Sequence, residues 1–164
     1  GVFHFEYFNT TYLFDGAKYN KLPDMPFKRS NFNLLSTKEN IVYAFGGGED
    51  EPSYSTCAYL DMNTYKGNPD NVKWVKCPAM INPRSWAAAG IVNSQIVLAG
   101  GMDGQFSPTS EVDVLNTKTL SNWTMTNCNL PIGAAFLSGS VTSNGEFLVY
   151  IGVGPSGNTY MYKP

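Results

Sequence analysis

The chain has 164 residues, of which 43% are hydrophobic, 14% aromatic and only 15% charged, and its formal net charge is −2. Because the chain is not basic, its composition argues against a nucleic-acid partner. No apolar run approaches the roughly 18 residues of a membrane-spanning helix, so we expect no membrane span. The surface must be covered mainly by Asn, Thr, Ser and Tyr rather than by Lys and Glu.

Short runs of strand-like sequence recur along the whole chain. Each run is alternating or wholly apolar and is bounded by Gly, Pro, Asn or Asp, as strands require. Stretches of useful length with a helical period are absent from the sequence. Predicted strands outside the first full unit cover residues 2–7, 11–15, 86–92, 95–100, 111–115, 122–127 and 159–162. We therefore predict an all-β fold without substantial helix.

The strands group into four-stranded units that repeat. Residues 1–35 hold the end of one unit, 36–90 and 91–139 hold two full units, and 140–164 hold the start of a further one. The recurring positions are the pairs Gly46-Gly47 and Gly100-Gly101, the tryptophans Trp74 and Trp123, and the arginines Arg29 and Arg84. The glycine pairs lie 54 residues apart, and the two arginines, the only ones in the chain, lie 55 apart. This period with a Gly-Gly signature is typical of β-propeller blades.

These residues resemble the kelch repeat, whose pattern is a strand ending in Gly-Gly, a Tyr-containing strand ending near Asp, a spaced Trp, a Pro-rich turn and an Arg. The first full unit has Gly46-Gly47, Tyr59-Leu60-Asp61, Trp74, Pro78 and Arg84. The second has Gly100-Gly101, Val114-Leu115-Asn116, Trp123 and Pro131, with Gly133 where Arg would stand. The resemblance implies a kelch-type propeller of antiparallel blades, with the aromatic residues packed between blades.

The chain holds about three blade-equivalents, whereas propellers typically have four to eight blades. Such an arc would leave inter-blade faces and strand edges exposed. We therefore expect further blades as partners, either in a longer protein or in a second copy that closes a six-bladed ring.

The three cysteines bear on the compartment. If Asp61 faces Lys73 across a hairpin, Cys57 faces Cys77, which allows a cross-strand disulfide and an oxidising compartment. The alternative is two buried thiols. Cys128 takes the place of Cys77 after the tryptophan but has no matching partner, so we expect a small buried residue there. The sequence has no Cys-x-x-Cys motif or Cys/His cluster, and we predict neither a metal site nor a cofactor.

Two Asn-x-Thr sequons begin at Asn9 and Asn122 and are candidate glycosylation sites. Two or three sequons are expected by chance from the Asn, Ser and Thr content. The low charge and the possible disulfide favour a secreted protein over the alternative of a cytoplasmic one.

No catalytic constellation stands out. Some kelch-like propellers carry a copper-radical oxidase site that needs two histidines, but the chain has only His4. The acidic run Glu49-Asp50-Glu51 sits in one loop and is typical of a solvated loop rather than a carboxylate pair. The glycine run 46–48 is not followed by the Gly-Lys-Ser/Thr of a phosphate loop. We predict no catalytic residue in this chain.

The loops between second and third strands and the connections between units would share one rim of a propeller. The candidate partner-binding residues of this rim are Arg29, Arg84, Glu49, Asp50, Glu51, Tyr54, Asp103 and Phe106. Arginine and exposed aromatic residues dominate interface energies, and we expect the two arginines to project from this rim. The alternative is that each arginine caps strand-end carbonyls.

The leading hypothesis is a non-catalytic protein-interaction or structural scaffold module in an extracellular or cytoskeletal assembly, since one kelch subfamily crosslinks actin filaments. Its external partner would be a protein such as a filament or matrix component. The alternative is part of a propeller enzyme, or of a carbohydrate-binding protein, whose active residues lie outside this chain.

Overall fold

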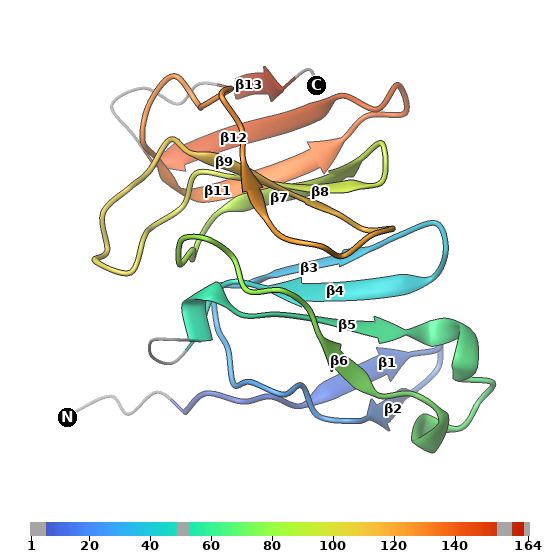
Figure 1. Ribbon diagram of the computed structural model, residues 1–164. Helices are drawn as coiled ribbons and strands as arrows, with labels where there is room; N and C mark the ends of the chain where they lie inside the picture. The colour runs from blue at the N-terminus through green and yellow to red at the C-terminus, as the bar shows by residue number, and fades with distance from the viewer. Residues whose placement is uncertain (1–5, 49–52, 154–158, 163–164) are drawn as a thin grey trace.

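The computed structural model describes residues 6–48, 53–153 and 159–162, and it contains four antiparallel sheets (Figure 1). The first is a hairpin of β1 (Thr11–Phe14) and β2 (Tyr19–Leu22). The second runs in order through β3 (Asn33–Ser36), β4 (Ile41–Phe45), β5 (Cys57–Asp61) and β6 (Trp74–Lys76). The third comprises β7 (Ala88–Val92), β8 (Gln95–Ala99), β9 (Val112–Asn116) and β10 (Thr124–Met125). The fourth comprises β11 (Ala135–Val141), β12 (Phe147–Val153) and β13 (Thr159–Tyr162).

The predicted all-β fold of antiparallel four-stranded sheets is confirmed. Within the described ranges the only helical segments are the 3₁₀ turns η1 (Ser53–Ser55), η2 (Met62–Thr64) and η3 (Pro69–Asn71). None of the described helical segments is long or apolar enough to cross a membrane. The sheets β3–β6, β7–β10 and β11–β13 begin a few residues before the unit boundaries expected at 36, 91 and 140.

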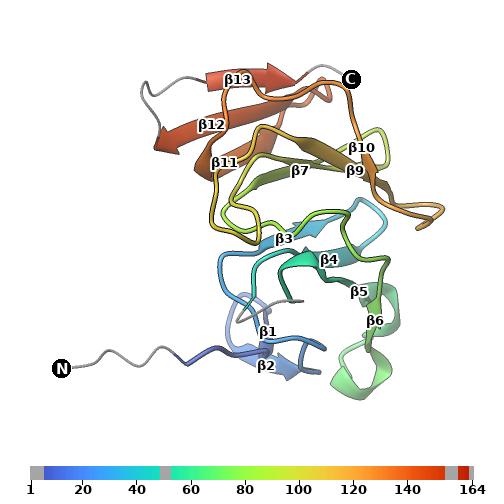
Figure 2. The ribbon, with the colours of Figure 1, turned by 60° about the vertical axis from the view of Figure 1, so that its left-hand side comes forward.

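The four sheets stack face to face, from the N-terminal hairpin at the bottom of Figure 1 to β11–β13 at the top, and Figure 2 shows the same order from another side. An apolar core fills each of the three joints between neighbouring sheets. In β4, Tyr43 and Phe45 pack toward the third sheet, whereas Val42 packs toward the hairpin. Successive strand residues point to opposite faces, so a sheet buried on both faces needs the wholly apolar runs seen in the sequence.

The glycine pairs bring each second strand against the next connection. Gly47 (φ 55°) donates its N–H to the carbonyl of Arg84 at 2.7 Å, and Gly101 (φ 95°) donates to the carbonyl of Ala134 at 2.8 Å. A Cβ atom on Gly47 would lie 2.1 Å from the carbonyl oxygen of Ser30. The pairs are glycine because the backbone takes positive φ and leaves no room for a side chain.

The spaced tryptophans also join neighbouring sheets. The indole Nε1 of Trp74 donates to the carbonyl of Pro23 at 3.1 Å, and that of Trp123 donates to the carbonyl of Pro78 at 3.1 Å. Trp123 is buried and packs on Phe45, whereas Trp74 is half-buried. The Trp and the Pro of the repeat are therefore the two ends of one contact, which we name the inter-sheet staple.

The strands β1, β5 and β9 end in the same way. The side-chain oxygens of Asp15, Asp61 and Asn116 accept the backbone N–H two residues later, at 3.0, 2.9 and 2.9 Å. Asp and Asn favour this local turn because their side chains imitate a backbone carbonyl. The recurring Asp or Asn of the repeat thus stops the strand.

Three expectations need correction: the strand over residues 2–7, the burial and place of Cys128, and the position of the missing arginine. Of the strand predicted over residues 2–7, residues 6 and 7 are not in a strand, and residues 2–5, with His4, lie outside the described part of the chain. Cys128 is exposed rather than buried. Its predicted place belongs to Thr126, whose N–H bonds the carbonyl of Val112 (2.8 Å) as that of Cys77 bonds Cys57 (2.9 Å).

In the unit of residues 91–139, the position that corresponds to Arg84 was also assigned to the wrong residue. Ala134 donates its N–H to the carbonyl of Thr109 at 3.2 Å, just as Arg84 donates to that of Tyr54 at 3.1 Å. The position equivalent to Arg84 is therefore Ala134 and not Gly133.

Candidate functional site

The rim is formed where the connection of residues 81–85 meets the loop of residues 102–110, on the left of Figure 1. Ser85 and Met102 exchange backbone hydrogen bonds of 3.0 and 2.8 Å, which join the two segments. Of the residues predicted for the rim, Arg84, Asp103 and Phe106 lie on these segments. Glu49, Asp50 and Glu51 lie outside the described residues.

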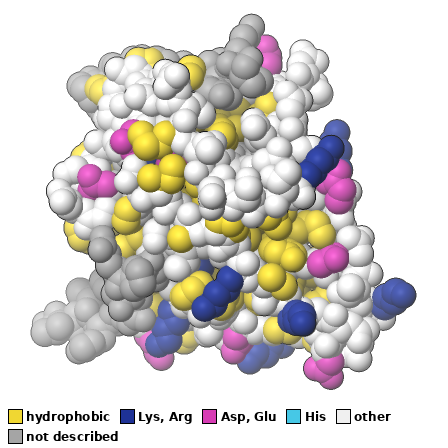
Figure 3. Space-filling model, in the orientation of Figure 1, with side chains coloured by type: hydrophobic (Ala, Val, Ile, Leu, Met, Phe, Trp, Pro, Cys, Tyr) yellow, Lys and Arg dark blue, Asp and Glu magenta, His cyan; other side chains and the backbone are white. Residues whose placement is uncertain are grey.

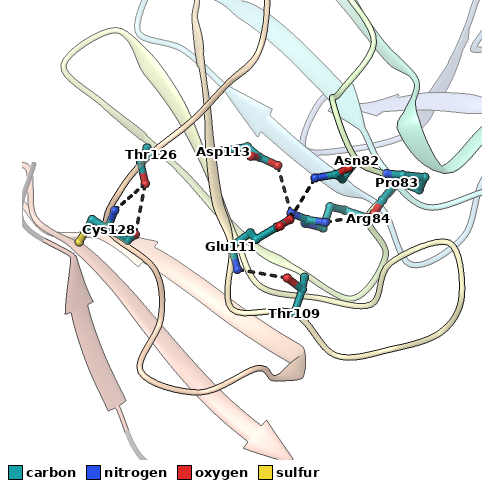
Figure 4. Close-up of polar contacts among 8 residues, drawn as sticks. All are labelled: Asn82, Pro83, Arg84, Thr109, Glu111, Asp113, Thr126 and Cys128. Carbon is teal, nitrogen blue, oxygen red and sulfur yellow. Dashed lines mark hydrogen bonds and ion pairs between the residues drawn. The ribbon is translucent and has the colours of Figure 1, made fainter.

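Arg84 is held by two carboxylates (Figure 4). Its Nη2 donates to Oε2 of Glu111 and, at 3.3 Å, to Oδ2 of Asp113. Arg84 and Asp113 are 1% and 0% exposed, whereas the side chain of Glu111 is 32% exposed. Nδ2 of Asn82 donates to the same Glu111 oxygen at 3.1 Å. The guanidinium is therefore committed to an internal ion pair rather than presented to solvent.

The cluster holds two acidic groups for one basic group. Oδ1 of Asp113 is buried without a hydrogen-bond partner in the structure. Burial raises the pKa of Asp113 above its ordinary value of 3.8, although the guanidinium of Arg84 opposes that rise. A buried carboxylate that lacks a partner for one oxygen is costly when ionised, which is the physical cause of the raised pKa.

Arg29 occupies the same position one unit earlier but has neutral partners. Its Nη1 donates to the carbonyl of Gly46 at 2.6 Å, and its Nη2 donates to Oγ1 of Thr56 at 2.9 Å. The guanidinium lies 5.7 and 5.8 Å from the ring centres of Phe27 and Phe32. Burial lowers the pKa of Arg29 to about 10. Thr56 stands 55 residues before Glu111, as Ala58 does before Asp113, so the acidic pair is particular to the third sheet.

The prediction that the two arginines project from the rim is wrong. Both side chains are buried, because each connection crosses the end of its sheet and turns the arginine inward between the strand ends. Capping of a strand-end carbonyl, the alternative interpretation, describes Arg29, which bonds Gly46 at the end of β4.

The two aromatic rim residues differ in exposure, since Tyr54 is half-buried. Phe106 is 59% exposed, and its ring meets that of Tyr54 edge to face, with the centroids 6.3 Å apart. Ile81, on the connection of residues 81–85, is 50% exposed. Asp103 instead closes its own loop, because its Oδ1 accepts the N–H groups of Gln105 and Ser107 at 2.8 and 2.9 Å.

A polar pocket of about 320 Å³ opens between the two segments. Its lining residues are Asn82, Pro83, Arg84, Asp103, Gly104, Gln105, Thr109 and Glu111. Glu111 and Asp113 were missed at the sequence level. The signal was available, because a Glu-x-Asp pattern replaces the Thr-x-Ala of the preceding unit at the same phase. Among the described residues, no three His, Cys, Asp or Glu side chains converge on a position suited to a metal ion.

The other predicted sites lie away from the rim. Cys57 and Cys77 face each other in the predicted register and are free thiols in the structure. Nδ2 of Asn9, the glycosylation atom of the first sequon, donates to the carbonyl of Met25 at 3.0 Å, whereas Asn122 is exposed. Use of either sequon stays a prediction.

Comparisons with known proteins agree with the architecture. No family model matches the chain. A stretch of 90 residues is 28% identical to alpha-scruin of Limulus polyphemus and covers 52% of this chain and 10% of that protein. The structure superposes on that of YjhT, a kelch-repeat propeller, with a TM-score of 0.65, at 22% sequence identity and over 79% of this chain.

The fold of the chain is an arc of blades like those of a kelch propeller. Its stacked sheets, glycine pairs and inter-sheet staples account for the sequence pattern of the repeat. This arc spans 36% of the YjhT chain and a tenth of alpha-scruin. The comparison with YjhT concerns the fold alone, so the role of the arc is argued from its own rim.

Proposed function

We propose that the chain is a non-catalytic, protein-binding part of a kelch propeller. Its rim would hold a partner through the exposed side chains of Ile81 and Phe106 and the half-buried side chain of Tyr54, which we name the apolar rim patch. The pocket at Glu111 lies beside this patch. The observation that carries the proposal is the 59% exposure of Phe106 in a loop that its own hydrogen bonds hold in place.

The apolar rim patch has the character of an interface anchor. Large aromatic side chains contribute most to binding when a partner covers them, and the edge-to-face contact with Tyr54 fixes the direction of the Phe106 ring. The loop of Phe106 is closed by Asp103 and by the hydrogen bond from the Phe106 N–H to the Asp103 carbonyl at 3.1 Å. A preformed loop loses little conformational entropy on binding. Figure 3 also shows hydrophobic side chains exposed in the middle of one face of the molecule.

The pocket supports a basic group on the partner. Its charged lining residues are two acids, Asp103 and Glu111, and one base, Arg84. Arg84 is already paired with Glu111 and with the buried Asp113 behind the pocket. The remaining charge is negative, and the part of Glu111 that reaches solvent is available to a Lys or Arg side chain. The preferred partner is therefore a segment with an apolar side chain next to a basic one.

A display library of random peptides selected on the chain tests this proposal. We expect enriched peptides that combine an apolar residue with Lys or Arg, and we expect Phe106→Ala to abolish their binding. Met125→Ala is the matched control, because Met125 is 50% exposed on β10, away from the apolar rim patch. Peptides without that combination, or equal binding to the two variants, would contradict the proposal.

Carbohydrate recognition is the second candidate. Phe136 is 47% exposed and its ring packs on that of Trp86 with the centroids 5.1 Å apart, which offers an aromatic surface for a sugar ring. A glycan array separates the two proposals. Binding of defined glycans that is lost in Phe136→Ala and kept in Phe106→Ala would favour the carbohydrate role.

A further inference from the structure

The strongest chemical feature outside the rim is a pair of cysteines, Cys57 at the start of β5 and Cys77 directly after β6. The register pairs Tyr59 with Val75 and Ala58 with Lys76, so the next pair outward is Cys57 with Cys77. The N–H of Cys77 donates to the carbonyl of Cys57 at 2.9 Å. Directly opposite residues in a hydrogen-bonded antiparallel pair have Cα atoms about 5.5 Å apart, inside the range of roughly 4.4–6.8 Å that a disulfide requires.

The two side chains lie on the same face of the sheet. Both pack against the core between the second and third sheets, and the neighbouring thiol of Cys77 is the largest cause of the raised pKa of Cys57. A bond between the sulfur atoms therefore needs no change of register and no movement of a strand. We propose that Cys57 and Cys77 are a reversible redox pair, which a small disulfide such as oxidised glutathione converts into a cross-strand disulfide.

The environment of the pair assigns a role to each thiol. Cys57 is 2% exposed, whereas Cys77 is half-exposed and is the one that a small oxidant can reach. The neighbouring thiol of Cys77 and then burial raise the pKa of Cys57, which keeps this thiol protonated. The positive charge of Arg29 opposes this rise in the pKa of Cys57 without cancelling it. Cys77 is thus the attacking thiol and Cys57 the resolving one.

The reaction balances in two exchange steps. Cys77 loses its proton to solvent, and its thiolate attacks one sulfur of oxidised glutathione, which forms a mixed disulfide and releases one glutathione thiolate. Cys57 then loses its proton and attacks the sulfur of Cys77, which forms the Cys57–Cys77 bond and releases the second glutathione. The two protein thiols lose two electrons, and one glutathione disulfide is reduced to two thiols.

The third cysteine is an internal control. Cys128 is exposed. In Figure 4 its backbone N–H and its backbone carbonyl both bond the hydroxyl of Thr126, each at 3.2 Å. The place equivalent to Cys77 in the third sheet is held by Thr126, opposite Val112. If solvent exposure alone decided which cysteine reacts, Cys128 would be modified first. Cys128 would then carry glutathione and form no disulfide within the chain.

Peptide mapping under non-reducing conditions tests the proposal. The chain is incubated with oxidised glutathione, free thiols are blocked by alkylation, and the chain is cleaved after Lys and Arg. The three cysteines then fall in three different peptides, 39–66, 77–84 and 119–163. We expect a linked product of peptides 39–66 and 77–84 that dithiothreitol removes. We also expect the thermal midpoint of the oxidised Cys128→Ser variant to rise by roughly 5–10 °C.

Two variants separate the attacking thiol from the resolving one. In Cys57→Ser, Cys77 should accumulate as a stable glutathione adduct, because the resolving thiol is gone. In Cys77→Ser, Cys57 should stay unmodified, because it is buried. Circular dichroism checks that both variants are folded. Two results would overturn the proposal. One is a wild-type sample in which Cys128 carries glutathione while Cys57 and Cys77 are still thiols and are therefore alkylated. The other is a dominant disulfide link through Cys128.

Discussion

The indole N–H of Trp123 bonds the carbonyl of Pro78 at 3.1 Å, and these two residues come from neighbouring sheets. Trp74 makes the same bond to Pro23, one sheet earlier. The spaced Trp and the Pro-rich turn follow each other closely within a unit, as Trp74 and Pro78 do, but each makes its contact with a neighbouring unit. Their spacing is constrained because the contact has to form between sheets rather than within one.

Trp123→Phe should destabilise the fold by about 2 kcal/mol, because it leaves the Pro78 carbonyl without its donor and opens space in a packed joint. Trp74→Phe should cost less, since Trp74 is only half-buried. Urea unfolding followed by circular dichroism measures both values. An equal loss for the two variants would show that burial does not set the strength of the staple.

Gly47→Ala should be strongly destabilising, by about 3 kcal/mol or more, since its Cβ would lie 2.1 Å from the Ser30 carbonyl oxygen. Gly16→Ala is the matched control. Gly16 also has positive φ (97°), but a Cβ there would meet no atom within 4 Å, so only the backbone strain of about 1 kcal/mol remains. Thermal unfolding of the two variants compares them, and similar midpoints would contradict the steric argument.

The free energy of unfolding should depend on pH through the titration of Asp113. Its pKa is raised in the folded chain above 3.8, so between these two values the folded state binds more protons than the unfolded state. The contribution of Asp113 is therefore fully present below pH 3.8 and is lost as the pH rises through the raised pKa. Asp113→Asn should remove this component. Urea midpoints measured from pH 3.5 to 8 test it, and a variant with the same pH profile as the wild type would disprove the assignment.

The double variant Glu111→Thr with Asp113→Ala gives the third sheet the partners that Arg29 has in the second. We expect a folded chain whose stability changes by no more than about 1 kcal/mol, because Arg29 is already accommodated by Thr56 and a carbonyl group. Glu111→Thr alone leaves Asp113 in place and serves as the comparison. Peptide binding at the pocket should fall in both variants. Loss of folding in the double variant would mean that the two arginine sites are not equivalent.

The sequence predicted the role of a residue correctly where that role depends on the local backbone. Gly47 and Gly101 need positive φ and close approach, and Asp61 stops a strand by a local hydrogen bond, so their meaning is visible in the order of residues alone. The direction of Arg84 was not visible, because it depends on Glu111 and Asp113, 27 and 29 residues away.

Small insertions were the other source of error. The segment from Cys77 to Met80 corresponds to that from Thr126 to Leu130, which is one residue longer, since Met80 and Leu130 make equivalent bonds to the carbonyls of Ser55 and Ser110. Counting from the tryptophan therefore placed the equivalent of Arg84 at Gly133, one residue before its true equivalent, Ala134. Hydrogen-bond partners reveal such a shift, whereas residue spacing conceals it.

The staple and the glycine contact both couple a sheet only to the next sheet along the chain. The arc is therefore a row of nearest-neighbour units rather than one indivisible core. Opening should begin at an end of the row and advance one sheet at a time. The amide hydrogens of β1 and β2 would then exchange with solvent long before those of β8, which is covered on both faces.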